Sequence, residues 1–179
     1  FVSSNYNGAQ TSCSGSSDGE VTVNIIGGQA TYNIIWDATT LSQTTATATG
    51  LAAGTYFVTV TDFFGCTTSD SVTITSPDSV SLSIIDTTHV LCFGQPTGSF
   101  TVAGSGGVLP YTYSIDGGIT FTTTVLYDNL PANMFGSGYC VIVQDANGCQ
   151  ATACVNINEP TQLQGLVDSI IMVSCFGGA

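Results

Sequence analysis

The chain contains an internal repeat, and this feature constrains its fold more than any other. The nine residues VTVTDFFGC at 58–66 return as VIVQDANGC at 141–149. Adding 83 to each residue number carries Val58–Gly94 without a gap onto a second copy, and upstream the offset becomes 79. The coinciding positions include Cys13 and Cys92, Cys66 and Cys149, Pro77 and Pro160, and Cys92 and Cys175. A sequence that repeats at this length indicates one structural module per copy.

The repeat divides the chain into two whole modules and part of a third. Module one covers residues 1–77 and module two covers 78–160, while 161–179 is expected to be the first strand of a truncated third module. Module two gains four residues between Leu130 and Tyr139, where the offset changes from 79 to 83. The chain is therefore interpreted as a piece of a longer array.

The residue pattern predicts an all-β chain. Short β-branched and aromatic runs alternate with Gly, Asn, Asp and Pro, and helical periodicity is hard to find. In module two the expected strands are Val80–Val90, Ser99–Ala103, Tyr111–Ile115, Phe121–Tyr127, Tyr139–Asp145 and Cys149–Ile157, and module one repeats that order. Two facing sheets are the usual way for such strands to bury one face each. We therefore expect tandem immunoglobulin-like β-sandwich modules.

Composition excludes several functions. The chain has no lysine or arginine, 12 acidic residues and a formal net charge of -12. It therefore offers no surface that neutralises phosphates, and we expect no nucleic-acid partner. The same absence removes Schiff-base lysines and arginine clamps. No apolar run reaches the length of a membrane helix, and no signal-peptide pattern occurs.

Cysteine usage indicates the compartment. Seven cysteines beside a single histidine favour disulfides over zinc. Disulfides persist in oxidising surroundings, so we expect an extracellular protein. Small modules of this size also need such cross-links, because they bury too little surface to be stable by packing alone.

The hairpin around DANG predicts one disulfide through its register. Asp-Ala-Asn-Gly suits a type I turn in which Gly148 takes the left-handed conformation of a bulge. Counting outward from this turn places Cys140 opposite Cys154 in a non-hydrogen-bonded pair, where Cα atoms approach to about 4.5 Å and a bridge can close. The equivalent positions in module one are Phe57 and Ser71. This bridge therefore belongs to module two alone.

The remaining cysteines are paired by counting strands. If each of six strands crosses the sandwich, the turn after the first and the turn before the last lie at the same end of the module. This count pairs cysteines within each module, namely Cys13 with Cys66 and Cys92 with Cys149. Cys175 is left to pair with a residue beyond Ala179, and a free reactive thiol is the alternative for it.

The order of these motifs resembles one known family. The stretches CSGSSDGEVTV and GLAAGTYFVTVTDFFGC, then DANGC, NEPTQL and VSCFGGA, follow one another along nearly the whole chain. This combination is similar to the SprB-type repeat of cell-surface adhesins of gliding bacteria of the Bacteroidetes type. Departures are the extra Cys140 and Cys154 pair, the insertion containing NMFG, and Ile115 at the position of Trp36.

The resemblance implies a very large secreted cell-surface protein, exported by the type IX route and used to grip surfaces. It brings no catalytic residues, and we expect no enzyme activity. It also implies O-glycosylation at Asp-Ser or Asp-Thr followed by an apolar residue or threonine. The matching acceptors are Ser71, Ser79, Thr87 and Ser169.

Other residue types admit functional and structural interpretations side by side. His89 has no nucleophile or second ligand near it in sequence, so a structural role is expected. Trp36 could stack on a sugar, but a sandwich commonly buries a tryptophan. No cofactor is expected, although acidic loop residues keep calcium open as a ligand. These residues are Asp18, Glu20, Asp37, Asp116 and Asp128.

Two functional hypotheses follow from these features. In the first, the modules form a structural and adhesive stalk or filament whose partners are neighbouring modules, other copies, and external surfaces or polysaccharide. In the second, they are carbohydrate-binding accessory modules of a secreted enzyme. Phe63 and Phe64 stand where module two has Ala-Asn at the tip of a turn. Exposed adjacent aromatics favour a contact loop.

Overall fold

The computed structural model describes residues 1–37, 42–133 and 138–166, and its regular structure there consists of β-strands. In module one the strands are β1 (Val2–Ser3), β2 (Gly19–Thr22), β3 (Asn33–Trp36), β4 (Thr47–Leu51), β5 (Gly54–Thr61) and β6 (Thr67–Ile74). In module two they are β7 (Ser81–Thr88), β8 (Gly98–Ser105), β9 (Thr112–Ser114), β10 (Leu126–Leu130), β11 (Tyr139–Gln144) and β12 (Gln150–Val155). No helix in the described part is long and apolar enough to cross a membrane.

Each module is a sandwich of two three-stranded antiparallel sheets. In module one the sheets have the orders β1-β2-β4 and β3-β5-β6, and in module two the orders β10-β8-β7 and β12-β11-β9. The repeat offsets carry β2, β3, β4, β5 and β6 onto β8, β9, β10, β11 and β12. The prediction of an all-β chain is confirmed.

Each module has its own hydrophobic core. The first core contains Trp36, Leu51 and Ile74 among its largest buried side chains, and the second contains Phe100, Val141 and Ile157. Along β3, β5 and most of β8, buried residues alternate with more accessible ones, as the two-residue period of a sheet requires. The two cores fall on either side of the expected boundary after Pro77.

The DANG hairpin forms with the expected register. Gly148 has a φ of 87°, and the Asp145 N–H donates to the Cys149 carbonyl over 3.0 Å. The pairing of β11 with β12 then places Cys140 opposite Cys154, and these two cysteines are bridged with their Cα atoms 4.0 Å apart. Val141 and Val143 point to the opposite face and are fully buried.

One expected strand differs from the structure in a way that changes the chain's path. The strand expected at Phe121–Tyr127 lies instead at β10, Leu126–Leu130. β9 and β10 both run in the same direction through the module, because β10 pairs antiparallel with β8 and ends opposite Gly98, where β8 begins. Residues 115–125 must therefore return across the sandwich without forming a strand of their own.

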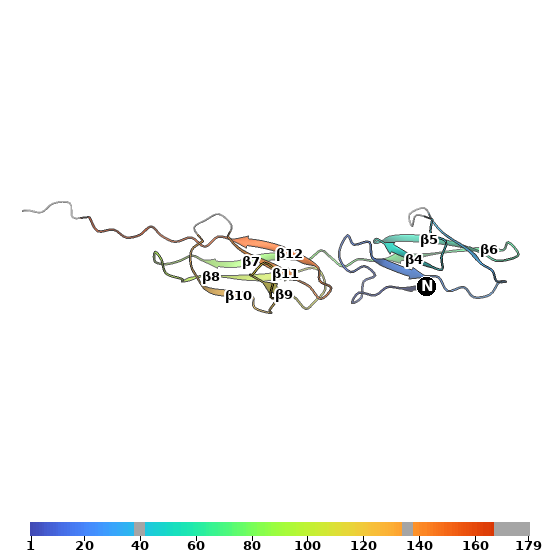
Figure 1. Ribbon diagram of the computed structural model, residues 1–179, viewed down its shortest axis with the longest axis horizontal. Helices are drawn as coiled ribbons and strands as arrows, with labels where there is room; N and C mark the ends of the chain where they lie inside the picture. Colours follow the sequence, from blue (N-terminus) through green and yellow to red (C-terminus); the bar gives the residue numbers. More distant parts are fainter. Residues whose placement is uncertain (38–41, 134–137, 167–179) are drawn as a thin grey trace, which may run out of the picture.

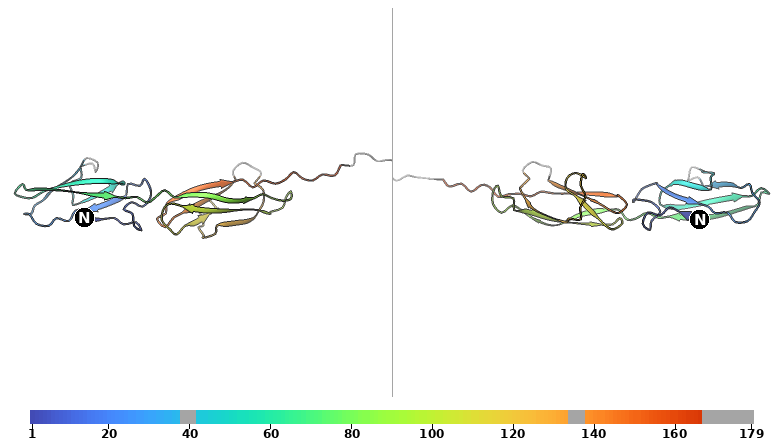
Figure 2. Two further views of the ribbon diagram at one scale, coloured as in Figure 1. Left: turned by 180° about the vertical axis from the view of Figure 1, so that it is seen from behind. Right: turned by 60° about the horizontal axis from the view of Figure 1, so that its bottom comes forward.

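This extra crossing places the chain's entry and exit at opposite ends of module two. At the end where the chain enters module two, which we call the entry pole, the Val108 N–H donates to Asp145 in the β11–β12 turn. At the end where the chain leaves the module, the exit pole, the Val90 N–H beyond β7 donates to the Asn158 carbonyl beyond β12. The modules consequently follow one another in line, as Figures 1 and 2 show. Residues 161–166, which leave the exit pole, form no strand, and the rest of the expected third-module strand lies outside the described residues.

Candidate functional site

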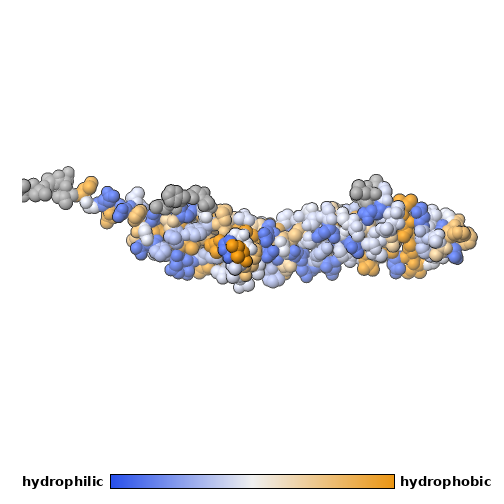
Figure 3. Space-filling model, viewed as in Figure 1, coloured by the Kyte–Doolittle hydropathy of each residue, from blue (hydrophilic) through white to orange (hydrophobic). Residues whose placement is uncertain are grey.

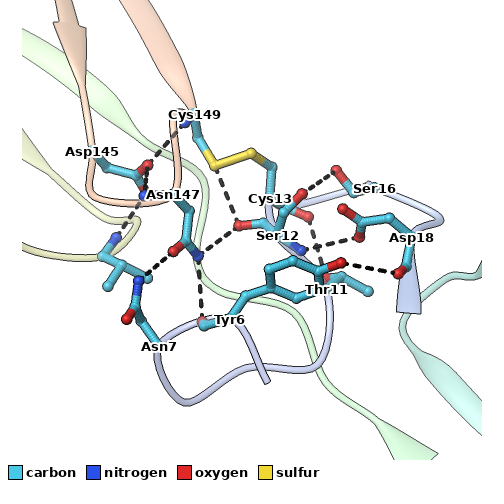
Figure 4. Close-up of a disulfide and its surroundings, with 11 residues drawn as sticks. Tyr6, Asn7, Thr11, Ser12, Cys13, Ser16, Asp18, Asp145, Asn147 and Cys149 are labelled. Atoms are coloured by element: carbon cyan, nitrogen blue, oxygen red, sulfur yellow. Dashed lines mark hydrogen bonds between the residues drawn. A yellow bond between two sulfur atoms is a disulfide. The ribbon is translucent and has the colours of Figure 1, made fainter. Parts of the chain in front are cut away.

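The two modules are joined by a disulfide, and this joint is the candidate functional site. Cys13 of module one is bonded to Cys149 of module two, with Cα atoms 5.8 Å apart and a sequence separation of 136 (Figure 4). We call this pair the joint bridge. Cys66 and Cys92 are exposed free thiols.

The expected pairing of these four cysteines within modules is therefore wrong. That pairing, Cys13 with Cys66 and Cys92 with Cys149, assumed that every connection between consecutive strands is a turn that sends the chain back toward the other end of the module. The uncounted return of residues 115–125 moves the last hairpin turn of module two from the exit pole to the entry pole. Cys149 thus meets the preceding module, while Cys92 remains at the far end.

Asn147 is the centre of the polar contacts at the joint. Its side-chain Nδ2 donates to the Ser12 carbonyl over 2.9 Å and to the Tyr6 carbonyl over 3.3 Å. Its Oδ1 accepts from Asn7 Nδ2 over 2.6 Å. The Cys149 sulfur lies 3.4 Å from the Ser12 carbonyl oxygen, which is a contact because a bridged sulfur has no proton to donate. Figure 4 shows Asn147 between these three partners of module one.

A turn near the N-terminus brings Asn7 to the joint. Tyr6 and Ala9 form a short antiparallel bridge, and Asn7 and Gly8 between them have φ values of 54° and 104°. Asn-Gly suits such a turn because both residues tolerate the left-handed conformation. Module two has no counterpart of this turn, since only His89 separates the end of β7 from Val90, the equivalent of Thr11.

Two carboxylates hold the cysteine turns in shape. Asp145 Oδ1 accepts from the backbone N–H groups of Asn147 and Cys149 over 2.9 and 2.8 Å. On the other side of the joint, Asp18 Oδ1 accepts from the Ser12 N–H over 3.0 Å. Hydrogen bonds from the Ser12 side chain and backbone lower the pKa of the Asp18 carboxyl below its ordinary value. A carboxylate thus accepts backbone hydrogen bonds in each of the two turns that carry the bridged cysteines.

The peptide linker between the modules is bonded at both ends. The Gln10 and Thr11 N–H groups donate to the Thr75 carbonyl of module one over 3.0 and 3.1 Å. The Gly107 N–H donates to the Asp78 carbonyl over 2.9 Å, which attaches the linker to module two. A Cβ at Gly106 would lie 2.0 Å from the Ser79 oxygen, so only glycine allows this close approach. The joint thus has a short bonded linker beside the disulfide.

The aromatic pair Phe63 and Phe64 lies at the opposite end of module one. The side chains are 66% and 75% exposed, and their rings meet edge to face at 5.3 Å and 79°. By the repeat register they occupy the positions of Ala146 and Asn147, the turn that contacts the neighbouring module. The contact-loop hypothesis remains a prediction. By this equivalence, the expected contact of Phe63 and Phe64 is with another module.

The expected glycosylation acceptors have different surroundings. Ser71 and Ser79 are exposed and Thr87 is partly buried on β7. Ser79 lines a hollow beside the joint bridge, so a glycan there would sit at the joint. Ser169 and Cys175 lie outside the described residues. All four acceptors remain predictions.

The single histidine and tryptophan have structural contacts. His89 Nδ1 accepts from the Asn158 N–H over 3.3 Å, and Gln10 Oε1 accepts from the equivalent Thr75 N–H over 2.9 Å in module one. Trp36 is fully buried and donates from Nε1 to the Thr45 carbonyl over 3.0 Å.

Three of the acidic loop residues, Asp18, Asp116 and Asp128, accept hydrogen bonds from the protein's own donors. Asp116 accepts from Ser114 Oγ over 2.6 Å and from Thr120 Oγ over 2.5 Å, and these hydrogen bonds lower the pKa of its carboxyl well below the ordinary value. Asp128 accepts from Asn129 Nδ2 over 2.9 Å. Within the described ranges, no three acidic, thiol or imidazole side chains are grouped as a metal site would require. Calcium binding remains an untested expectation.

Sequence reasoning missed the polar residues of the joint. Asn147 was interpreted as turn chemistry alone, and Asn7 and Ser12 were not singled out. One available signal was the NYNG stretch at 5–8, which has no partner in module two and contains a turn dipeptide. An insertion at the end of a module that adjoins another module is a reasonable place to expect a contact.

Comparisons with known proteins agree with the fold. A solved structure of three N-terminal domains of the bacteriophage RB49 highly immunogenic outer capsid protein, Hoc, matches with a TM-score of 0.52 and 19% identity. The match covers 83% of this chain and 56% of that chain, so this chain spans little more than half the length of the Hoc fragment. At this identity the similarity concerns the fold alone. No curated protein matches the sequence.

The model of the SprB repeat matches the chain at residues 6–40 and again at 84–120. Together the two ranges cover less than half of the chain, and each begins at or near the start of a module and ends beyond its third strand. The chain is therefore similar to the SprB repeat at two places, one in each of its β-sandwich modules.

Proposed function

We propose that this chain is a structural and adhesive segment of a secreted cell-surface protein, in which paired modules serve as stiff elements of a stalk. Similarity to the SprB repeat supports a surface location and an adhesive role. Export by the type IX route and a part in gliding belong to the same proposal.

The observation that carries the proposal is the covalent joint. A disulfide, a linker bonded at both ends, and the Asn147 hydrogen bonds connect the same two poles. Flexible linkers allow neighbouring domains to reorient freely. A joint with three independent connections restricts bending, which suits a stalk that must hold an adhesive surface away from the cell.

The alternative, a carbohydrate-binding accessory module, has less support. Sugar-stacking sites use flat aromatic surfaces, and the exposed Phe63 and Phe64 rings stand 79° apart. Trp36 is buried and unavailable to a ligand. Retention of the chain on a glycan column would nevertheless favour this alternative.

Small-angle scattering and a bead-adhesion assay test the proposal together. The chain should have the maximum dimension of an in-line pair of modules, and the double variant Cys13→Ser with Cys149→Ser should show a broader distribution. Beads coated with the chain should resist detachment from glass or polysaccharide more than beads coated with an unrelated acidic protein. An equally narrow distribution in both proteins, or detachment no harder than for control beads, would count against the stalk or the adhesive role respectively.

A further inference from the structure

The joint brings together the two Asn-Gly dipeptides of the chain. Asn7-Gly8 and Asn147-Gly148 are the only such pairs in the sequence. Asn7 Nδ2 donates to Asn147 Oδ1 over 2.6 Å, so the two asparagines meet across the module boundary (Figure 4). Asparagine loses its amide most readily before glycine, because a residue without a side chain leaves its backbone nitrogen unhindered and its backbone free to rotate. The joint therefore contains a candidate site of chemical modification.

In the closed joint the side-chain amide of Asn147 is held by module one. Its Nδ2 donates to the Ser12 and Tyr6 carbonyls over 2.9 and 3.3 Å, and its Oδ1 accepts the bond from Asn7. Deamidation requires this side chain to turn toward the backbone nitrogen of the next residue. Each hydrogen bond that must first break adds to the barrier for that rotation.

The backbone of the same turn is held from within module two. The Gly148 N–H donates to the Asp145 carbonyl over 3.1 Å, and Asp145 Oδ1 accepts from the N–H groups of Asn147 and Cys149. These bonds do not cross the joint, whereas the bonds of the Asn147 amide do. Opening the joint therefore frees the reacting side chain while the turn around it stays bonded.

Module one contains the same turn without an asparagine. Phe64-Gly65 is the repeat equivalent of Asn147-Gly148, and the Gly65 N–H donates to the Asp62 carbonyl over 3.0 Å. Asp62 Oδ1 also accepts from the Phe64 N–H over 3.0 Å. The Phe64 side chain is 75% exposed. An asparagine at this position would thus have the backbone bonds of the joint turn and none of the contacts across the joint.

A carboxylate at position 147 does not fit the closed joint. The Ser12 and Tyr6 carbonyl oxygens are acceptors, and a carboxylate has no proton to donate to them. The chain has no lysine or arginine to pair with the new charge. The turns on the two sides already contain the carboxyl groups of Asp145 and Asp18. Isoaspartate would in addition lengthen the main chain of the turn by one atom.

Water, the second reactant, reaches the site. Gly148 is exposed and Asn147 is only partly buried. Figure 3 shows mainly hydrophilic or neutral residues on the visible surface where the two modules meet. The contacts of the Asn147 side chain, and not access of water, therefore limit the reaction in the closed joint.

We propose that Asn147 is a deamidation site that the closed joint protects, and that its conversion makes an opened joint unable to close fully again. The Gly148 nitrogen attacks Cγ of Asn147, the bond from Cγ to the amide nitrogen breaks, and ammonia leaves with the Gly148 N–H proton. Water then opens the succinimide ring at one of the two bonds to the Gly148 nitrogen. Cleavage of the bond to Cγ gives aspartate, and cleavage of the bond to the Asn147 carbonyl carbon gives isoaspartate.

Ageing of the purified chain at mildly alkaline pH tests the protection. Mass spectrometry of chymotryptic peptides follows the conversion of the amide to a carboxyl group. Asn147 should deamidate about tenfold faster or more in the double variant Cys13→Ser with Cys149→Ser than in the parent chain, because fewer hydrogen bonds hold its side chain. An equal rate at Asn147 in both proteins would overturn the protection.

The variant Phe64→Asn is a matched control, because it places an Asn-Gly pair in the equivalent turn of module one while the joint stays closed. Position 64 should deamidate about tenfold faster or more than Asn147 in the same molecule. A rate at position 64 no higher than that at Asn147 would show that the turn, and not the joint, sets the rate, and would overturn the proposal.

The variant Asn147→Asp tests the consequence for closing, since it reproduces one product of the reaction. In a buffer of reduced and oxidised glutathione, the ratio of bridged to open joint should be lower than in the parent chain by about tenfold or more, which corresponds to about 1.4 kcal/mol. Asn33→Asp adds the same charge at an exposed position of β3 and should leave the ratio unchanged. Equal ratios in these two variants would overturn the effect on closing.

The inference goes beyond the proposed stalk function and does not depend on adhesion. Deamidation rates and bridge ratios are measured on the chain in solution, whereas scattering and bead detachment measure the stalk. Unchanged deamidation rates would therefore leave the stalk proposal standing, and a failed adhesion assay would leave the modification site standing.

Discussion

The joint bridge should shield most of the chain from mechanical extension. When force is applied between the two termini, the path runs from the N-terminus to Cys13, through the bridge to Cys149, and on to the C-terminus. The 136 residues of sequence separation between the bridged cysteines then carry no load. Only the short stretches outside the bridge can be extended while it is intact.

The perturbation is the double variant Cys13→Ser with Cys149→Ser. The Cys140–Cys154 bridge remains and still shields 14 residues. The variant should therefore release the difference between 136 and 14, or 122 residues, more than the parent chain. At about 3.5 Å for each extended residue, this is an additional contour length of about 430 Å.

Optical tweezers or force microscopy can measure this length on single molecules attached by their termini. Bridges confined to each module, Cys13 to Cys66 and Cys92 to Cys149, would shield 53 and 57 residues respectively. The parent chain would then release roughly 90 Å more than the structure allows, at about 3.5 Å for each of the 26 residues of difference. A parent chain that releases this longer length, or the same length as the double variant, would refute the joint bridge.

Three further predictions concern single features. Asn147→Ala should make the joint bridge easier to reduce by about 1 kcal/mol, because the substitution removes hydrogen bonds across the joint. The control Asn33→Ala, at an exposed position of β3, should leave the reduction potential of the bridge unchanged. Titration with dithiothreitol measures the potential in both variants, and equal potentials would contradict the role of Asn147. Asp116→Asn should reduce the loss of stability in acid. A carboxyl whose pKa is lowered in the folded state stabilises the fold at pH values above its ordinary pKa of 3.8, and this contribution is lost as the pH falls below 3.8. Melting temperatures measured from pH 6 to 2 that fall with the same slope in both proteins would refute this. Phe57→Cys with Ser71→Cys should form a bridge in module one, because these residues face each other as Cys140 and Cys154 do, and should stabilise the module by about 3 kcal/mol in denaturant titrations under non-reducing conditions. A variant with two more free thiols than the parent chain would show that the registers differ.

Loop entropy gives the scale of the joint bridge in stability as well. In the chain-entropy model, closing a loop with a sequence separation of 136 contributes about 5 kcal/mol at 25 °C. This is a large part of the stability of a small domain. The bridge links two cores, so its removal should also separate one unfolding transition into two.

Local features of the fold could be predicted from the sequence. The two-residue alternation of apolar side chains identified most of the strands, although it misplaced β10, and the DANG turn fixed the pairing of Cys140 with Cys154. Turn chemistry and strand pairing depend on residues close together in the chain, so the sequence around a hairpin contains most of the needed information. The equivalence of Cys66 with Cys149 likewise follows from the repeat alone.

The partners of Cys13 and Cys149 were decided by the tertiary structure. Whether residues 115–125 form a strand or merely return across the sandwich depends on packing against both sheets, which no local pattern records. That single return exchanges the pole at which the last hairpin lies, and so converts a bridge within a module into a bridge between modules. The sequence by itself determined which residues form hairpins and where the repeats begin. Only the three-dimensional path of the chain decided which turns meet, because a distance between residues remote in sequence depends on the direction of every segment between them.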